Sequence, residues 1–140
     1  MITAIPSLER VKALLADANL PAEDLTEAHC QGFFYTGSSR APTGIVGLEM
    51  FGDVALLRSL VVAPAGRNAG AGSALVRHAE EHARGRGVRG LYLLTTTAEA
   101  FFDKRGYTRV ARETAPAAIR ATKEFAGLCP ASSAFMTKLL

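Results

Sequence analysis

The stretch from Val61 to Leu75 constrains the fold of this chain more than any other. It reads VVAPAGRNAGAGSAL, so an apolar segment passes through a glycine-rich turn into an amphipathic segment. The first amides of a helix lack intrahelical acceptors and the helix dipole attracts anions, so a strand, a glycine-rich turn and a helix together favour phosphate binding. Gly66, Gly70 and Gly72 let the backbone approach a ligand, and Arg67 adds a fixed positive charge. The sequence therefore predicts a phosphate-binding turn here.

Spacing excludes the two most common glycine-rich phosphate-binding turns. A P-loop needs Gly-Lys-Ser or Gly-Lys-Thr, but Gly72 is followed by Ser73 and Ala74. A dinucleotide-binding turn needs Gly-x-Gly-x-x-Gly, but Leu75 stands where the third glycine belongs. The remaining pattern is Arg67-x-x-Gly70-x-Gly72, preceded by Val62-x-Pro64.

This remaining pattern resembles the acyl-CoA pyrophosphate loop of the GNAT superfamily of N-acetyltransferases. A second feature of that family follows at the expected distance, because residues 98–107 read AEAFFDKRGY and match the family's Ala-x-x-Leu-Tyr-x-x-x-Gly-Phe segment. The resemblance covers roughly residues 45–107 and implies one GNAT acetyltransferase domain over residues 1–140. The implied fold is α+β, with a central, mostly antiparallel twisted sheet of about six or seven strands flanked by helices. The alternative is an unrelated α/β domain with a glycine-rich connector.

Length and composition fit a globular protein with one core. The chain has 140 residues, of which 49% are hydrophobic and 21% charged. No apolar run is long enough to span a bilayer, and the first residues lack the basic and then apolar order of a signal peptide. We therefore expect a cytoplasmic protein with no membrane partner.

Arginines cluster between Arg84 and Arg89, so a nucleic-acid patch has to be considered. No aromatic residue is interleaved with them, and cations also suit the C-terminal end of a helix. The net charge is only +3. We expect no nucleic-acid partner, and a mild positive field of this kind suits a nucleotide-bearing cofactor.

His78 and His82 stand four residues apart on a predicted helix, and with Glu81 they match the His-x-x-Glu-His spacing of some zinc sites. Such a site needs a third ligand from elsewhere, and the same helix already begins at the phosphate-binding turn. Cys30 and Cys129 lack metal-type spacing. We therefore expect no metal site and two solvent-facing histidines.

Hydrophobic periodicity and turn residues predict an alternating order of strands and helices. Ser7 is the expected N-cap of the first helix, and Gly106 is expected to end a later helix in a left-handed turn. In a short helix over residues 22–28, Leu25 should pack inward while the acids face water. Strands are predicted at residues 2–5, 31–37, 43–51, 54–62, 91–94, 107–111 and 133–139. Further helices are predicted at 8–18, 73–86 and 98–105, with one or two short helices over 116–125.

The resemblance implies acetyl-CoA as co-substrate. In the resembling family, the backbone of the strand before the loop pairs with the pantetheine, and one of its amides faces the thioester oxygen. That strand end corresponds to Leu60, Val61 and Val62. The pyrophosphate would be bound by the loop and the first helical turn, which consist of Arg67, Asn68, Ala69, Gly70, Ala71, Gly72 and Ser73.

The tyrosine that commonly protonates the leaving thiolate in this family is replaced by Phe102. A phenyl ring cannot donate a proton, so Phe102 would keep only a packing role beside the thiol. Water or another hydroxyl must then supply the proton. The hydroxyl candidates are Tyr92, Thr97, Tyr107 and Ser133.

The general base is also not the usual one, because Arg58 stands where many relatives carry a glutamate. An arginine does not accept a proton at neutral pH, but its planar group of N–H donors suits a carboxylate. Our hypothesis is that Arg58 anchors an acidic acceptor while Glu49, on the neighbouring strand, deprotonates the amine directly or through water. The alternative is that both are ordinary solvent-exposed charges.

Two further resemblances concern the acceptor, a small-molecule amine. Residues 91–106 are similar to the acetyltransferase part of N-acetylglutamate synthases, which acetylate the α-amine of glutamate. The second half of the chain resembles small acetyltransferases associated with arsenic-resistance operons, some of which modify arsenic- or phosphorus-containing glutamate mimics. Both imply an acidic amino acid or a glutamate-like analogue. The candidate substrate-binding residues are Arg58, Thr95, Thr96, Arg120 and Ser133.

Two other functions stay open at this point. A peptide or protein N-acetyltransferase would use the same scaffold and cofactor, although those relatives usually keep the tyrosine that Phe102 replaces. A catalytically idle acyl-CoA-binding sensor would explain the missing acid. A homodimer is a further expectation, because similar proteins often share edge strands.

Overall fold

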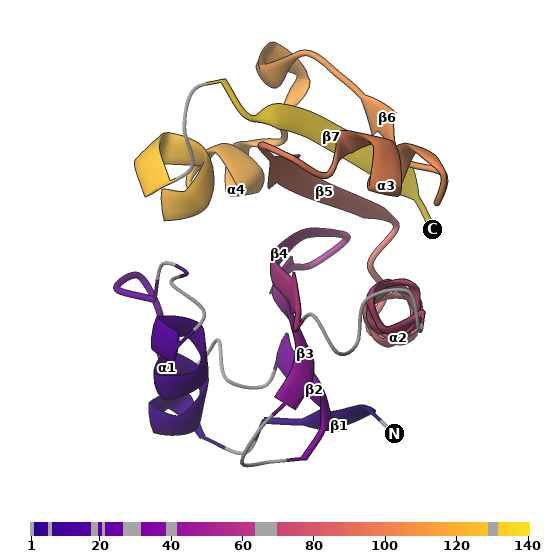
Figure 1. Cartoon of the computed structure of the whole chain (residues 1–140). Coiled ribbons are helices and arrows are strands. Elements are labelled where there is room, and N and C mark those ends of the chain that lie inside the picture. Colours follow the sequence, from indigo (N-terminus) through magenta and orange to yellow (C-terminus); the bar gives the residue numbers. More distant parts are fainter. Residues whose placement is uncertain are drawn as a thin grey trace. The chain divides into compact units, whose positions relative to one another are not determined.

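The structure is a computed structural model (Figure 1) that describes residues 2–5, 7–17, 20, 22–26, 32–38, 42–63, 70–128 and 132–140. Seven strands form one sheet in the order β1-β2-β3-β4-β5-β7-β6, which confirms the predicted α+β class. The chain divides into two compact units, residues 1–49 with 57–82 and residues 50–56 with 83–140. Among the described residues, no helix combines the length and the apolar character needed to cross a bilayer.

The first unit holds most of the N-terminal half of the chain. Strands β1, β2 and β3 pair antiparallel, and a glycine with φ of 71° at position 52 turns the chain from β3 into β4. Helix α1 lies on one side of these strands and helix α2 on the other (Figure 1). The elements are β1 (Ile2–Ala4), α1 (Leu8–Asp17), β2 (Phe33–Gly37), β3 (Pro42–Phe51), β4 (Val54–Val62) and α2 (Ala71–Gly85), with the ends of β3, β4 and α2 shared with the second unit.

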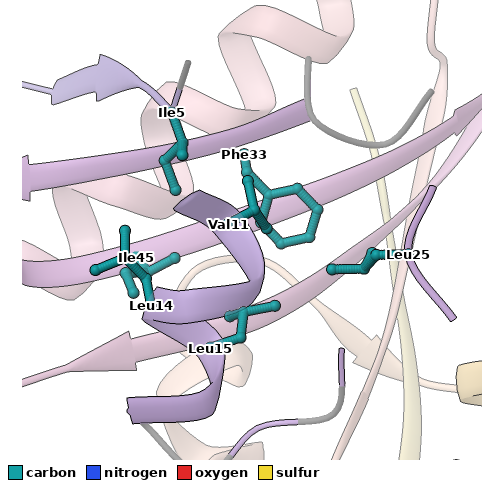
Figure 2. Packing of buried hydrophobic residues seen from close by; sticks show 7 residues of the cluster. All are labelled: Ile5, Val11, Leu14, Leu15, Leu25, Phe33 and Ile45. Carbon is teal, nitrogen blue, oxygen red and sulfur yellow. The ribbon is translucent and has the colours of Figure 1, made fainter. Parts of the chain in front are cut away.

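Helix α1 begins and packs as its sequence predicts. The Ser7 hydroxyl accepts a hydrogen bond from the Arg10 amide (3.2 Å), so Ser7 caps the helix. Val11, Leu14 and Leu15 recur at helical spacing and are buried. Figure 2 shows these side chains among the other apolar residues of the first core, which also contains Ile5, Leu25, Phe33 and Ile45. Each buried side chain of this size stabilises the fold by about 1.5–3 kcal/mol.

Strand alternation sends Phe34, the neighbour of Phe33, toward α2. Its ring lies edge-on to His78 and His82, with centroid distances of 4.7 and 4.9 Å. The expectation of two solvent-facing histidines is therefore wrong, because both imidazoles pack against an aromatic ring of the sheet. Over the described part of the chain, no group of His, Cys, Asp or Glu residues is arranged to hold a metal ion.

The second unit is built around β7, which pairs antiparallel with both β5 and β6. Its core contains Leu56, Ala115, Ile119 and Phe135. The Gly106 backbone has a φ of 93°, in the left-handed region as predicted. The elements are β5 (Gly90–Thr95), α3 (Glu99–Asp103), β6 (Thr108–Arg109), η3 (Arg112–Thr114), α4 (Ala117–Arg120), η4 (Glu124–Leu128) and β7 (Ala134–Leu139).

Two predicted elements differ from the structure. The helix expected at residues 22–28 is absent over residues 22–26, where the Leu25 amide donates to the Ala22 carbonyl (3.1 Å) and closes a single tight turn. Residues 27–28 of that prediction lie outside the described residues. The strand expected at 107–111 is reduced to β6 (Thr108–Arg109), after which the Val110 amide still donates to the Phe135 carbonyl of β7 (2.9 Å) before Arg112 begins a short 3-10 helix.

Candidate active site

Three charged side chains meet in the first unit, and we call Asp24, Glu49 and Arg58 the Arg58 cluster. Arg58 Nη1 donates to Glu49 Oε1 and to Asp24 Oδ2, both at 2.6 Å, while Nη2 donates to Asp24 Oδ1 at 3.2 Å. Arg58 and Glu49 are each only 5% exposed. Neither is a solvent-exposed surface charge, and Arg58 forms an ion pair with each of the two acids.

The backbone of β4 is irregular beside this cluster. Ser59 has a φ of 58°, a left-handed conformation that is uncommon for a residue with a Cβ, and its hydroxyl accepts a hydrogen bond from Arg58 Nε (3.2 Å). The Phe33 ring lies 5.9 Å from Arg58 Cζ, within the range of a cation–π contact. Strained residues of this kind persist where the surrounding structure holds them, often next to functional sites.

These contacts occupy most of the hydrogen-bonding capacity of Arg58. A guanidinium has five N–H groups, and here one is used on Nε, two on Nη1 and one on Nη2. At most one N–H group is left, whereas bidentate binding of a further carboxylate needs two. The Arg58 guanidinium is therefore already bound to a carboxylate of the protein itself.

Asp24 is the member of the cluster that sequence reasoning missed. The acids of residues 22–28 were expected to face water, but the Asp24 side chain is only 4% exposed and faces Arg58. The two residues are 34 positions apart, so no local periodicity could relate them. The sequence contained one signal of a buried acid, because Asp24 directly precedes the apolar Leu25. Leu25 is only 4% exposed and belongs to the core.

Seven of the predicted cofactor residues lie at the end of β4 or around the start of α2. Leu60, Val61 and Val62 are the last residues of β4 and are half-buried. Gly70 has a φ of 80°, and its carbonyl accepts a hydrogen bond from the Ala74 amide (3.0 Å). Ala71, Gly72 and Ser73 form the first turn of α2, where amides lack intrahelical acceptors. Arg67, Asn68 and Ala69 lie outside the described residues.

The other predicted substrate residues belong to the second unit. The β5–β7 register pairs Thr95 with Ala134, so Thr95 and Ser133 lie at the same end of this strand pair. The Thr95 hydroxyl accepts a hydrogen bond from the Ala98 amide (3.0 Å), and Thr96 is exposed. Ser133 is 4% exposed, and its Oγ has no hydrogen-bond partner among the described residues.

Arg120, at the end of α4, is exposed. Its Nε donates to the Ala115 carbonyl (3.2 Å), which orients the guanidinium from one side. The two other nitrogens of the guanidinium carry N–H groups that can bind a carboxylate from solvent.

Phe102 packs as a buried aromatic residue. Its ring lies edge-on to Phe101 and Tyr107, with centroid distances of 5.1 and 5.4 Å. Among the candidate proton donors, Tyr107 is buried against Phe102, Tyr92 stacks on Phe135 (5.5 Å), and Thr97 is exposed.

Comparison with known proteins identifies the class to which this chain belongs. The model of the acetyltransferase (GNAT) family matches residues 7–107, well over half of the chain, and the chain therefore belongs to this family. This confirms the predicted membership of the GNAT family of acetyltransferases. No curated protein matches the sequence.

Solved structures show the same fold over the whole chain. N-acetylglutamate synthase from Neisseria gonorrhoeae, complexed with coenzyme A and N-acetyl-glutamate, aligns with a TM-score of 0.79 and 21% identity. The alignment covers 100% of this chain and 35% of that one, so this chain spans about a third of that enzyme. Rv2747 from Mycobacterium tuberculosis, in complex with CoA and NLQ, aligns with a TM-score of 0.76 and 21% identity over 100% and 99% of the two chains.

Proposed function

We propose that this protein transfers the acetyl group of acetyl-CoA to the amine of a small acceptor, an acidic amino acid or a glutamate-like analogue. The observation that carries the proposal is Glu49, a carboxyl group that is buried beside β4 and held at 2.6 Å from Arg58. A positioned carboxylate of this kind can take a proton from an acceptor ammonium group, directly or through one water.

The chemical step needs an uncharged amine. Glu49 removes a proton from the acceptor ammonium, and the amine nitrogen then attacks the thioester carbon. The carbonyl oxygen gains negative charge, which a backbone amide at Leu60, Val61 or Val62 stabilises. The carbon–sulfur bond breaks and the acetyl group stays on nitrogen, which loses its second proton to solvent. The thiolate leaves and takes up a proton from water or a nearby hydroxyl. The loop and helix start at residues 67–73 hold the pyrophosphate.

The role of Arg58 in this proposal differs from the acceptor clamp that the sequence suggested. Its N–H groups already bind Asp24, Glu49 and Ser59, so it holds the base instead of the acceptor. Arg120, whose guanidinium is exposed, stays a residue that we propose for the acid of the acceptor. Hydroxyls of Thr95, Thr96 and Ser133 complete the proposed acceptor contacts, and Phe102 packs beside the thiol.

Support for an acidic acceptor comes from a protein of the same fold. The Neisseria gonorrhoeae enzyme is an N-acetylglutamate synthase, and its structure holds N-acetyl-glutamate together with coenzyme A. The resemblance to arsenic-linked acetyltransferases extends the proposed acceptors to phosphinic and arsinic analogues of glutamate, with a role in resistance to such compounds. One GNAT domain over the whole chain, a cytoplasmic location and a homodimer stay predictions.

The test is acetyl-CoA turnover, read as thiol release, with glutamate, aspartate, other amino acids and phosphinic or arsinic glutamate analogues. Acceptor-dependent thiol release with an acidic compound is expected, and Glu49→Gln should lower kcat/KM by about 10²–10⁴-fold. Glu81→Gln, on the exposed face of α2, is the matched control and should leave turnover unchanged. Tight acetyl-CoA binding without turnover on any acceptor would contradict the proposal and favour a sensor.

A further inference from the structure

We infer that Asp24 is a positioning residue of the acetyl-transfer site, which acts by fixing Arg58 so that Arg58 holds Glu49. This inference rests on the proposed function, because it assumes that Glu49 is the base. Asp24 enters the site from the turn between α1 and β2, far in sequence from the two strands that carry its partners. Its link to Glu49 runs through a single guanidinium.

The geometry of the ion pair fixes the guanidinium plane. Asp24 receives two hydrogen bonds from two different nitrogens, Nη1 at 2.6 Å and Nη2 at 3.2 Å, which is a bidentate arrangement. Two contacts from a planar group set both its position and its rotation. Nη1 is the shared atom, and its second hydrogen bond reaches Glu49 at 2.6 Å. The direction of that bond is therefore set by Asp24.

Packing of the neighbouring Leu25 in the core holds the segment that carries Asp24. Leu25, the next residue, is 4% exposed, and Figure 2 shows its side chain pointing toward the Phe33 ring. The same ring lies 5.9 Å from Arg58 Cζ. The turn is closed by the Leu25 amide on the Ala22 carbonyl (3.1 Å). Asp24 thus sits on a segment that apolar packing anchors, which suits a residue whose task is to hold another in place.

The negative charge of Asp24 also sets the net charge of the Arg58 cluster. Two carboxylates and one guanidinium carry a net charge of −1 when all three are ionised, so the cluster favours an ammonium group over a carboxylate. Because Asp24 occupies the bidentate position on Arg58, Glu49 meets the guanidinium through Nη1. Without Asp24, the guanidinium would lose its bidentate partner, and its plane would no longer be fixed against Glu49.

The test is a double-mutant cycle on kcat/KM. Asp24→Asn keeps the shape and removes the charge, and it should lower kcat/KM by about 10–100-fold with KM for acetyl-CoA unchanged. In a Glu49→Gln background the same substitution should change kcat/KM by less than about twofold, because the residue it positions has gone. Glu23→Gln is the matched control, since Glu23 lies in the same turn and is exposed.

Each other outcome overturns the inference. An equal loss of kcat/KM in both backgrounds would show that Asp24 acts only as a structural residue. No loss of kcat/KM in the wild-type background would show that Asp24 has no role in activity. If Asp24→Asn fails to fold in circular dichroism, Asp24→Glu keeps the charge and is compared in the same two backgrounds. Wild-type protein without turnover on any amine would refute the proposed function itself, whereas an active wild type with additive losses refutes only the role of Asp24.

Discussion

Removing the side chain of Arg58 should strongly lower the stability of the fold. Arg58→Gln leaves Asp24 and Glu49 buried without their cation, so we expect the free energy of unfolding to fall by about 3–5 kcal/mol. Urea denaturation followed by circular dichroism measures the change. Arg109→Gln is the control, because its ion pair with Glu99 (3.3 Å) is exposed and should contribute about 0–1 kcal/mol. Similar losses for the two variants would contradict the buried cluster.

Ser133 offers a test in which stability and activity move in opposite directions. Ser133→Ala removes a buried hydroxyl that has no partner among the described residues, so the unfolding free energy should stay equal or rise by about 1 kcal/mol. If the hydroxyl binds the acceptor, KM for the acceptor should rise in the same variant. Thr122→Val is the control, since its buried hydroxyl donates to the Ile119 carbonyl (2.7 Å) and its loss should cost about 1 kcal/mol.

Among the elements, the register of β2 against β3 depends on a glycine. Phe33 pairs with Gly47, and a Cβ at position 47 would lie 2.7 Å from Phe33 Cζ. Gly47→Ala should therefore lower the free energy of unfolding by about 1–3 kcal/mol. Adding Phe33→Leu should recover part of that loss, which a double-mutant cycle in urea would show. If positions 33 and 47 were not in contact, the two substitutions would lower the free energy of unfolding additively, which would contradict this register.

The control for this prediction is Gly85→Ala at the end of α2. A Cβ there has open space around it, and Gly85 lies within a helix. Alanine is favoured over glycine in helices by about 0.5–1 kcal/mol, so this variant should be neutral or more stable. Destabilisation at both glycines would show that the effect is not specific to Phe33.

The sequence allowed prediction wherever local patterns decide the structure. Strand β4 has both of its predicted ends, Ser7 caps α1, and Gly106 has the predicted left-handed backbone, because periodicity, capping and glycine conformation act within a few residues. Prediction failed where distant residues meet. The pairing of Asp24 with Arg58 spans 34 positions. The contacts of His78 and His82 with Phe34 likewise depend on how α2 lies on the sheet.

At the scale of the whole molecule, acetyl-CoA should stabilise the folded chain. A ligand that binds only the folded state adds RT ln(1 + [L]/Kd), or about 2.7 kcal/mol at one hundred times Kd. We expect the midpoint of thermal unfolding to rise with acetyl-CoA concentration in a fluorescence melt. Adenosine without the pyrophosphate is the control and should shift the midpoint less, because the loop before α2 is the proposed anion site. An unchanged midpoint at millimolar acetyl-CoA would contradict binding.

The Arg58 cluster also has an evolutionary consequence. Loss of Arg58 leaves two buried carboxylates without their cation, whereas replacing a whole buried ionic cluster by apolar residues is often neutral for stability. Positions 24, 49 and 58 should therefore be inherited together or replaced together. Homologues with three apolar residues there would fold equally well but lack the proton acceptor. Co-variation at these three positions would then separate homologues that transfer acetyl groups from those that only bind acetyl-CoA.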